Sequence, residues 1–475
     1  MLFNSLQFLV FFPVVTLLYF LSPHKYRWIL LLLASCYFYM AYVPQYVLIL
    51  FFLILVDYVA GIFIEQAEGR KRKLILAISI ACNIGILCFF KYFTFLIENS
   101  SFFLGLIGKR NVSFPHMNLL LPIGLSFHTF QAISYTIEVY KRNQKAEKHL
   151  GIYALYIMFY PQLLAGPIES PQTLLPQFSE RKKFDVNRAI VGIKIMLFGF
   201  IKKVVIADRL GLIVNQVYQN PESAGSLNML LTVLIFFPFQ IYCDFSGYSS
   251  IALGAAKVMG FDLTENFKTP YFSATLTEFW SRWHISLNNW FRNYVYKPVA
   301  LRLRRFGKAS ILIAVFATFT LSGIWHGVGW TFVIFGIIQA IIISIELYFK
   351  IRTASLSKSF ITKLAGIVVT QFIIAMSLVF FRSVNIDQTT QVFSKLFWST
   401  SYHTSDVFSN KFTLIAYSVA IAFVILTMSF EKYSARLVIN KNLSLTREVT
   451  VTAFMVLVLL AFGVFNSLSF IYFQF

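Results

Sequence analysis

Two histidines stand out among the residues that could do chemistry. His326 lies in the sequence Ser322-Gly-Ile-Trp-His-Gly327, and His284 lies in the polar stretch Thr277 to Arg292. The unperturbed pKa of histidine is close to neutral pH, so its imidazole can take up and release protons under physiological conditions. Both residues are therefore candidates for acid–base chemistry, and the elements around them decide between that role and a structural one.

His326 lies in a long uncharged run. Residues 309–345 contain no Asp, Glu, Lys or Arg. As one straight helix this run would be about 55 Å long, well beyond a hydrocarbon core of about 30 Å. We expect the helix to break at Ser322-Gly323, Gly327 and Gly329, with His326 at the break. A titratable side chain there is costly unless it faces a cavity or a partner, which makes His326 a functional candidate. The alternative is a histidine at a hairpin tip that reaches water or headgroups.

His284 lies in a stretch that is too polar to span a membrane. Apolar residues recur there at helical spacing and predict one amphipathic helix with His284 on or beside its apolar stripe. They are Leu276, Phe279, Trp280, Trp283, Leu287, Trp290 and Phe291. Thr275 and Glu278 have the spacing of a capping box at its start. The alternative is an interfacial helix whose histidine only hydrogen-bonds a neighbour.

The composition predicts an all-α polytopic membrane protein. The 475 residues are 58% hydrophobic and only 13% charged, whereas about a quarter of a soluble chain is usually charged. A soluble protein of this size would lack the polar residues to cover its surface, so lipid must solvate much of it. The 54 Phe and 24 Tyr are typical of lipid-facing and interfacial positions.

The charge distribution also indicates a membrane protein. The net charge of +21 comes from short basic clusters between apolar runs, such as Arg70-Lys-Arg-Lys73 and Arg181-Lys-Lys183. This is the pattern of the positive-inside rule. A nucleic-acid-binding protein would gather these charges on a folded soluble face, so we expect lipid and no nucleic acid as a partner.

The cysteines and the N-terminus exclude two further classes. The four cysteines (Cys36, Cys82, Cys88, Cys243) lie in apolar stretches with no CxxC or Cys/His spacing, so we expect buried thiols and no metal site. The first residues are apolar and lack both a basic region and a cleavage site, which predicts a membrane span rather than a removed signal peptide.

We expect roughly ten to twelve spans in a single membrane domain over residues 1–475, some of them short or re-entrant. The candidates are Leu2 to Leu21, Trp28 to Ile64 (two spans with a turn near Pro44), Leu74 to Ile97, Leu150 to Leu164, Ala189 to Ile206, Leu227 to Cys243, Ile311 to Ile345, Leu364 to Phe381, Phe412 to Phe430 and Val449 to Phe475. Two segments rich in Pro and Gly, 121–131 and 160–169, are either ordinary interfacial turns or irregular backbone that protein or a cavity satisfies at membrane depth.

Five motifs taken together resemble the membrane-bound O-acyltransferase (MBOAT) superfamily, and within it the branch of the alginate O-acetyltransferase membrane component. They are Leu121-Pro-Ile-Gly-Leu-Ser-Phe, Ala165-Gly-Pro-Ile168, Asp244-Phe-Ser-Gly-Tyr248, Phe279-Trp-Ser-Arg-Trp-His-Ile-Ser-Leu287 and Ser322-Gly-Ile-Trp-His-Gly327. The resemblance covers nearly the whole chain, to the closing Phe470-Ile-Tyr-Phe-Gln-Phe475. His128 and Lys297 depart from the expected pattern, at positions to which no chemistry is assigned.

The resemblance implies a ring of tilted membrane helices, with re-entrant and amphipathic helices, around a central funnel. The principal catalytic histidine of the family matches His326, and the second signature histidine matches His284. We hypothesise that His326 is the general base and that His284, with Asn288 or Asn289, positions the donor or polarises its carbonyl. Trp280, Trp283 and Trp325 would shape a dry passage, and Arg282 would contact donor phosphates or the membrane interface.

The resemblance also implies an activity. Such proteins lie in the bacterial inner membrane. They take an acetyl group from cytosolic acetyl-CoA and pass it outward for O-acetylation of a polysaccharide. Acetyl-CoA is then a donor substrate, and no bound cofactor is expected. A separate SGNH-type transferase is the expected partner, because no esterase domain is visible in this chain. Two alternatives stay open at this point: a D-alanyl transferase acting on teichoic acid with a carrier-protein thioester, and a secondary transporter, which also uses broken helices.

Overall fold

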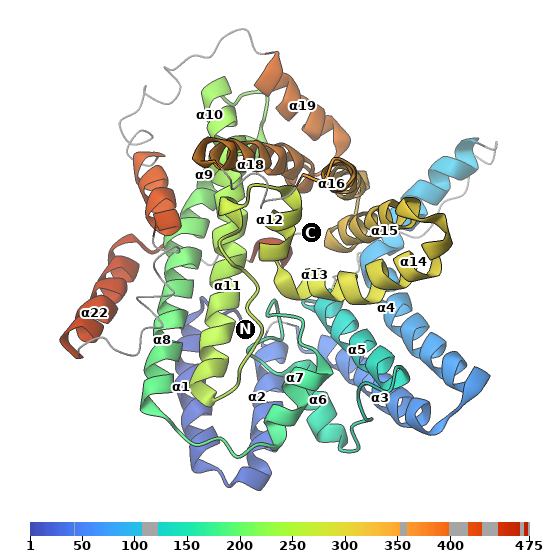
Figure 1. The fold of residues 1–475 in the computed structure, drawn as a ribbon. Coiled ribbons are helices and arrows are strands. Elements are labelled where there is room, and N and C mark those ends of the chain that lie inside the picture. Colours follow the sequence, from blue (N-terminus) through green and yellow to red (C-terminus); the bar gives the residue numbers. More distant parts are fainter. Residues whose placement is uncertain are drawn as a thin grey trace. The chain divides into compact units, whose positions relative to one another are not determined.

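The computed structural model describes residues 1–41, 43–106, 122–351, 359–398, 417–429, 445–465 and 470–473. The secondary structure of these residues is helical, with no strand among them (Figure 1). The chain forms two compact units, the first of residues 1–185 with 259–264 and the second of residues 186–258 with 265–475. The prediction of an all-α protein is confirmed, and the single membrane domain stays a prediction.

The first unit contains the helices before residue 186. They are α1 (Leu6–Leu21), α2 (Arg27–Met40), α3 (Tyr46–Gln66), α4 (Gly69–Leu106), α5 (Leu125–Tyr140), α6 (Leu150–Met158) and α7 (Pro171–Ser179).

The second unit contains both histidines of interest. Its main helices are α8 (Val186–Phe200), which continues through the π-helical turn η2 (Ile201–Ala207) into α9 (Asp208–Gln219), then α10 (Ser226–Leu231), η3 (Thr232–Phe236), α11 (Phe237–Met259), α12 (Leu276–Arg282), α13 (Ile285–Phe291), η5 (Arg292–Tyr296), α14 (Lys297–Arg302), α15 (Lys308–His326), α16 (Trp330–Tyr348), α18 (Phe360–Arg382), α19 (Ile386–Phe397) and α22 (Leu445–Phe462). A further helix covers Tyr417–Ser429.

Six helices among the described residues are long and apolar enough to cross a membrane. They are Tyr46–Gln66, Gly69–Ile97, Ser226–Met259, Lys308–His326, Trp330–Tyr348 and Phe360–Arg382. Three shorter apolar helices are Leu6–Leu21, Tyr417–Ser429 and Glu448–Phe462. The chain is therefore an integral membrane protein. The total of ten to twelve spans stays a prediction, and the expected span Phe412 to Phe430 lies partly outside the described residues.

The cysteines are less buried than expected. All four are free thiols, but only Cys243 is buried, while Cys36, Cys82 and Cys88 are half-buried. The three lie on α2 and α4, and only a small share of the apolar part of α4 is covered by protein. An apolar stretch in a membrane protein therefore does not predict burial, since lipid also accepts apolar side chains.

The predicted span Leu150 to Leu164 is wrong. Helix α6 ends at Met158, and residues 159–169 follow as a buried segment without helix. The carbonyl of Tyr156, released at the helix end, accepts hydrogen bonds from the side-chain amides of Gln131 (2.6 Å) and Gln162 (2.8 Å). Protein groups thus satisfy the irregular backbone, which is the second of the two readings of this Pro- and Gly-rich segment.

The break in the uncharged run is confirmed. Helix α15 ends at His326 and α16 begins at Trp330, with Gly327 to Gly329 between them. Ser322-Gly323, also expected at the break, lies inside α15. A Cβ on Gly323 would lie 2.3 Å from the Phe332 carbonyl oxygen and 3.1 Å from Gly336, so glycine at this position lets the two helices pack backbone to backbone.

Candidate active site

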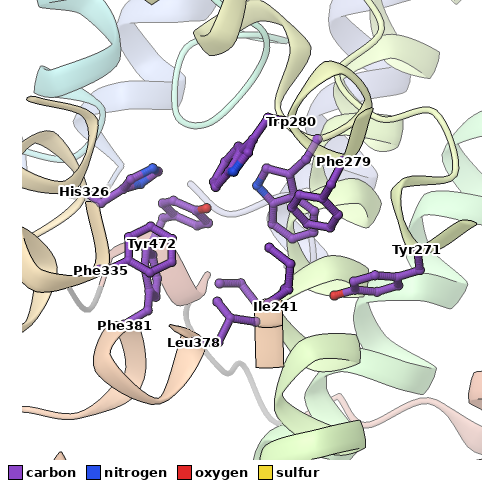
Figure 2. A pocket seen from close by; sticks show the side chains of 11 residues that line it. Ile241, Tyr271, Phe279, Trp280, His326, Phe335, Leu378, Phe381 and Tyr472 are labelled. Carbon is purple, nitrogen blue, oxygen red and sulfur yellow. The ribbon is translucent and has the colours of Figure 1, made fainter. Parts of the chain in front are cut away.

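His326 faces a small cavity in the second unit. Figure 2 shows the rings of His326, Tyr472 and Trp280 directed into it. The cavity volume is about 20 Å³, room for little more than one water-sized molecule. Its lining is mostly aromatic and aliphatic: Ile241, Tyr271, Phe279, Trp280, Trp283, His326, Phe335, Ile374, Leu378, Phe381 and Tyr472.

Aromatic rings enclose His326 at the end of α15. Only 4% of the residue is exposed, and its ring centroid lies 5.4 Å from Phe381, 5.8 Å from Tyr472 and 6.4 Å from Phe335. His326 is the last residue of α15, so the end of the helix holds its imidazole among these rings.

Trp280 is fixed in the cavity wall by a buried amide. Its Nε1–H donates to Oε1 of Gln339 (3.0 Å), and Nε2 of Gln339 donates to the Ser377 hydroxyl (2.9 Å). Gln339 is fully buried on α16. This network joins α12, α16 and α18, and it sets the indole in one orientation.

Helix α12 is anchored at its first turn by Glu346 of α16. The Glu346 carboxylate accepts hydrogen bonds from the Leu276 N–H (2.6 Å), the Thr277 N–H (2.9 Å) and the Thr277 hydroxyl (2.6 Å). The predicted cap is present, because the Thr275 hydroxyl accepts from the Glu278 N–H (3.1 Å). The Glu278 carboxylate reaches the Ala274 N–H (2.9 Å), one residue earlier than in a standard capping box.

The predicted continuous amphipathic helix is wrong. The chain breaks between α12 and α13 at His284, which has a left-handed backbone (φ 47°). Asn266 satisfies the freed backbone groups: its carbonyl accepts from the Ile285 N–H (3.0 Å) and its side-chain oxygen from the Ser286 N–H (3.1 Å). The side-chain amide of Asn288 donates to the Trp283 carbonyl (2.6 Å). Helical spacing alone could not reveal this break, since it depends on a partner far along the chain.

His284 is fully buried beside the cavity residues, and it does not itself line the cavity. Its ring centroid lies 4.6 Å from Phe245 and 6.2 Å from Trp325, and Trp325 lies 5.0 Å from His326. Burial first, and then the neighbouring His326, holds the pKa of His284 well below its ordinary value. The imidazole of His284 is therefore neutral at physiological pH.

The structure gathers some of the predicted site residues and separates others. His326, Trp280 and Trp283 line the cavity, and Trp325 and His284 pack next to it. Asn288 stabilises the break between α12 and α13, and Asn289 is half-buried on α13. Arg282 forms an ion pair with Glu278 and lies outside the lining. The chemical roles of these residues stay predictions.

Tyr472 is a cavity residue that sequence reasoning missed. It lies in Phe470–Tyr472, called the closing segment below. The Trp283 indole donates a hydrogen bond to the Tyr472 hydroxyl. Its ring is 6.1 Å from Phe381. The similarity of the closing residues to the MBOAT superfamily was the one available signal, because no spacing rule connects residue 472 with residue 326.

Comparison with known proteins gives a consistent result. The model of "MBOAT, membrane-bound O-acyltransferase family" matches residues 146–385. The chain is 33% identical to the probable alginate O-acetylase AlgI of Pseudomonas syringae pv. tomato over 88% of this chain and 79% of that protein. It is 30% identical to the peptidoglycan O-acetyltransferase of Helicobacter pylori (82% and 79%). It is 28% identical to the teichoic acid D-alanyltransferase of Bacillus subtilis over 50% of this chain and 61% of that protein.

Proposed function

Because the chain belongs to the membrane-bound O-acyltransferase family and is an O-acyltransferase, we propose that it moves an acetyl group from acetyl-CoA toward a polysaccharide outside the cytoplasm. One observation carries the proposal: His326 faces an apolar cavity that Trp280, Trp283 and Tyr472 close. All four residues belong to the second unit, and three of them lie within the matched residues.

His326 acts as the general base in this proposal. It takes the proton of the acceptor hydroxyl, whose oxygen attacks the thioester carbonyl and forms a tetrahedral oxyanion. The oxyanion collapses, the carbon–sulfur bond breaks, and the imidazolium returns its proton to the leaving thiolate. The aromatic lining excludes water, which would otherwise hydrolyse the thioester.

The size of the cavity supports a short acyl group. A volume of about 20 Å³ is little more than one water molecule occupies, so a long acyl chain would require the walls to separate. An acetyl methyl fits an apolar wall of Phe381, Leu378 and Ile374.

The same lining supports acetyl over D-alanyl transfer, the alternative within the superfamily. A D-alanyl group carries an ammonium, and burying an unpaired charge among apolar side chains is expensive. The similarity to the acetyl-transferring relatives also covers more of the chain, 88% and 82% against 50%. A secondary transporter disagrees with membership of an acyltransferase family.

The acceptor is a polysaccharide in our proposal, since the relatives act on alginate, on peptidoglycan or on teichoic acid by their names. We place the protein in the bacterial inner membrane, where cytosolic acetyl-CoA can reach it. An SGNH-type transferase outside the cytoplasm would complete the transfer to the glycan.

Reconstitution tests the proposal. Purified protein in liposomes receives radiolabelled acetyl-CoA on one side and glycan, with or without an SGNH-type transferase, on the other. We expect release of CoA and labelled glycan only when the transferase is present. Efficient labelling of the glycan without the transferase would refute the claim that a partner is needed. Turnover of a D-alanyl carrier-protein thioester in place of acetyl-CoA would refute acetyl-CoA as the donor.

A further inference from the structure

The motif Asp244-Phe-Ser-Gly-Tyr248 contributes no residue to the cavity lining. Its aspartate, on α11, belongs to a buried ionic cluster in the second unit. Lys203 Nζ lies 2.6 Å from Asp244 Oδ1 and 2.7 Å from Asp208 Oδ1, and the three side chains are 2–4% exposed. Burying charged groups is costly unless they are paired, and a buried ion pair is weak evidence for stability. The pairing alone therefore does not explain what this cluster contributes to the fold.

The second carboxylate oxygen of Asp244 accepts a hydrogen bond from the closing segment. The backbone N–H of Ile471 donates to Asp244 Oδ2 (2.7 Å). One carboxylate therefore joins Lys203 to the closing segment. Upstream, the Val464 N–H donates to the Val204 carbonyl (2.8 Å), which lies in the π-helical turn Ile201–Ala207. Two hydrogen bonds thus attach the last part of the chain to the same turn and its neighbour α11.

Aromatic contacts from the same motif support the attachment. Phe245 packs on Tyr472 (centroids 4.6 Å), and Tyr248 stacks on Phe470 (4.8 Å, 30°). Gly247 allows α11 to come close enough for the ion pair. A Cβ at this position would lie 2.8 Å from the Gly199 carbonyl oxygen and 3.0 Å from the Lys203 backbone nitrogen.

We propose that the Lys203–Asp244 pair positions the closing segment Phe470–Tyr472, so that Tyr472 forms the wall of the cavity beside His326. The Tyr472 ring lies 5.8 Å from His326, and its hydroxyl accepts a hydrogen bond from Trp283. Lys203 and Asp244 are positioning residues, because they act on the cavity through the segment that they hold. The effect on turnover rests on the proposed acyl transfer, whereas the attachment of the segment does not.

The chain supplies a matched control for this proposal. Asp208 pairs with Lys203 as Asp244 does, at 2.7 Å and in the same buried cluster. The N–H of Ile471 goes to Asp244. Asp244→Ala and Asp208→Ala therefore each remove one carboxyl partner from the same lysine, but only the first removes the acceptor of the closing segment.

A thiol introduced by Ile471→Cys reports attachment directly. Ile471 is 3% exposed, and its hydrogen bond to Asp244 comes from the backbone, so the substitution keeps that bond. Maleimide modification is followed by mass spectrometry of the C-terminal peptide, which separates it from the native thiols. We expect modification at least tenfold faster with Asp244→Ala than with Asp208→Ala or with the parent.

Turnover completes the test. We expect kcat to fall at least tenfold in Asp244→Ala with a smaller change in KM, and to stay within threefold in Asp208→Ala at a comparable loss of thermal stability. Equal modification rates in the two variants, or unchanged kcat in Asp244→Ala, would overturn the proposal. If Asp244→Ala fails to fold, Asp244→Leu and Asp208→Leu replace the pair, since leucine fills more of the space and also lacks an acceptor, and the same contrast is expected. Full turnover in His326→Ala would instead refute the acyl-transfer proposal and leave the modification result standing.

Discussion

Gly323→Ala should impair catalysis without touching a cavity residue. Gly323 lies on α15, three residues before His326, where the helix packs against α16. The added Cβ would lie 2.3 Å from the Phe332 carbonyl oxygen and 3.1 Å from Gly336. Both neighbours are backbone atoms, so no side chain can rotate away.

The size of the effect follows from these distances. Ordinary van der Waals contact begins at 3.4 Å, so the Cβ and the carbonyl oxygen must separate by about 1 Å, and α15 must move or rotate against α16. Overpacking of this kind costs about 1–3 kcal/mol of stability. A misplacement of about 1 Å in an active site lowers the rate by about 10²-fold. We therefore expect kcat to fall by about 10²-fold in a variant that is still folded at the assay temperature.

Gly85→Ala is the matched control. Gly85 is an exposed helical glycine on α4, and a Cβ there has no atom within 4 Å. Replacing it should leave turnover unchanged and stabilise the helix by roughly 0.5–1 kcal/mol. The assay is the release of CoA from acetyl-CoA in detergent with glycan and the SGNH-type transferase present, alongside thermal unfolding of each variant. Parent-like kcat in Gly323→Ala would refute the claim that the close packing of α15 on α16 positions His326.

Three further predictions concern the residues around the cavity. Gln339→Leu leaves the Trp280 indole N–H buried without an acceptor, which should cost about 1–3 kcal/mol and slow turnover; an unchanged unfolding midpoint would contradict it. Glu346→Gln removes the negative charge that accepts the three hydrogen bonds at the start of α12. It should lower the free energy of unfolding by roughly 1.5–3 kcal/mol. An unchanged unfolding midpoint would argue against this anchor. Burial lowers the pKa of the His284 imidazole, so the unfolded chain binds more protons at this residue than the folded chain does. The stability contributed by the buried neutral imidazole is therefore full above about pH 6.5 and is lost as the pH falls below that value. Unfolding midpoints between about pH 8 and pH 5 should fall less steeply in His284→Gln than in the parent, and parallel curves would exclude His284 as a source of the slope.

Local rules predicted much of the fold. The length of the uncharged run required a break, and the glycines after His326 located it, because a helix of about 55 Å cannot match a core of about 30 Å. Thr275 predicted the start of α12 correctly, since a cap needs only residues within one turn. The boundary of α6 was wrong, because the carbonyl of Tyr156 is satisfied by side chains of Gln131 and Gln162, and apolar composition alone does not show such partners.

The site was predicted in part. His326, Trp280 and Trp283 are brought together as expected, since the resemblance had marked both of their motifs. Tyr472 and Gln339 were missed, because their neighbours lie on other helices and no local period connects them. The break at His284 depends on Asn266, 18 positions earlier in the sequence, and for this reason a helical pattern continued across it.

The most direct test of the account is acetyl transfer by His326→Ala. The reconstituted assay compares the parent with His326→Ala and with a control, His24→Ala, in the connection after α1. Thermal unfolding first shows that all three proteins are folded. Loss of a general base should lower the rate by about 10²–10⁴-fold, and His24→Ala should transfer acetyl as the parent does. Normal transfer by folded His326→Ala would contradict the assignment of His326 as the base.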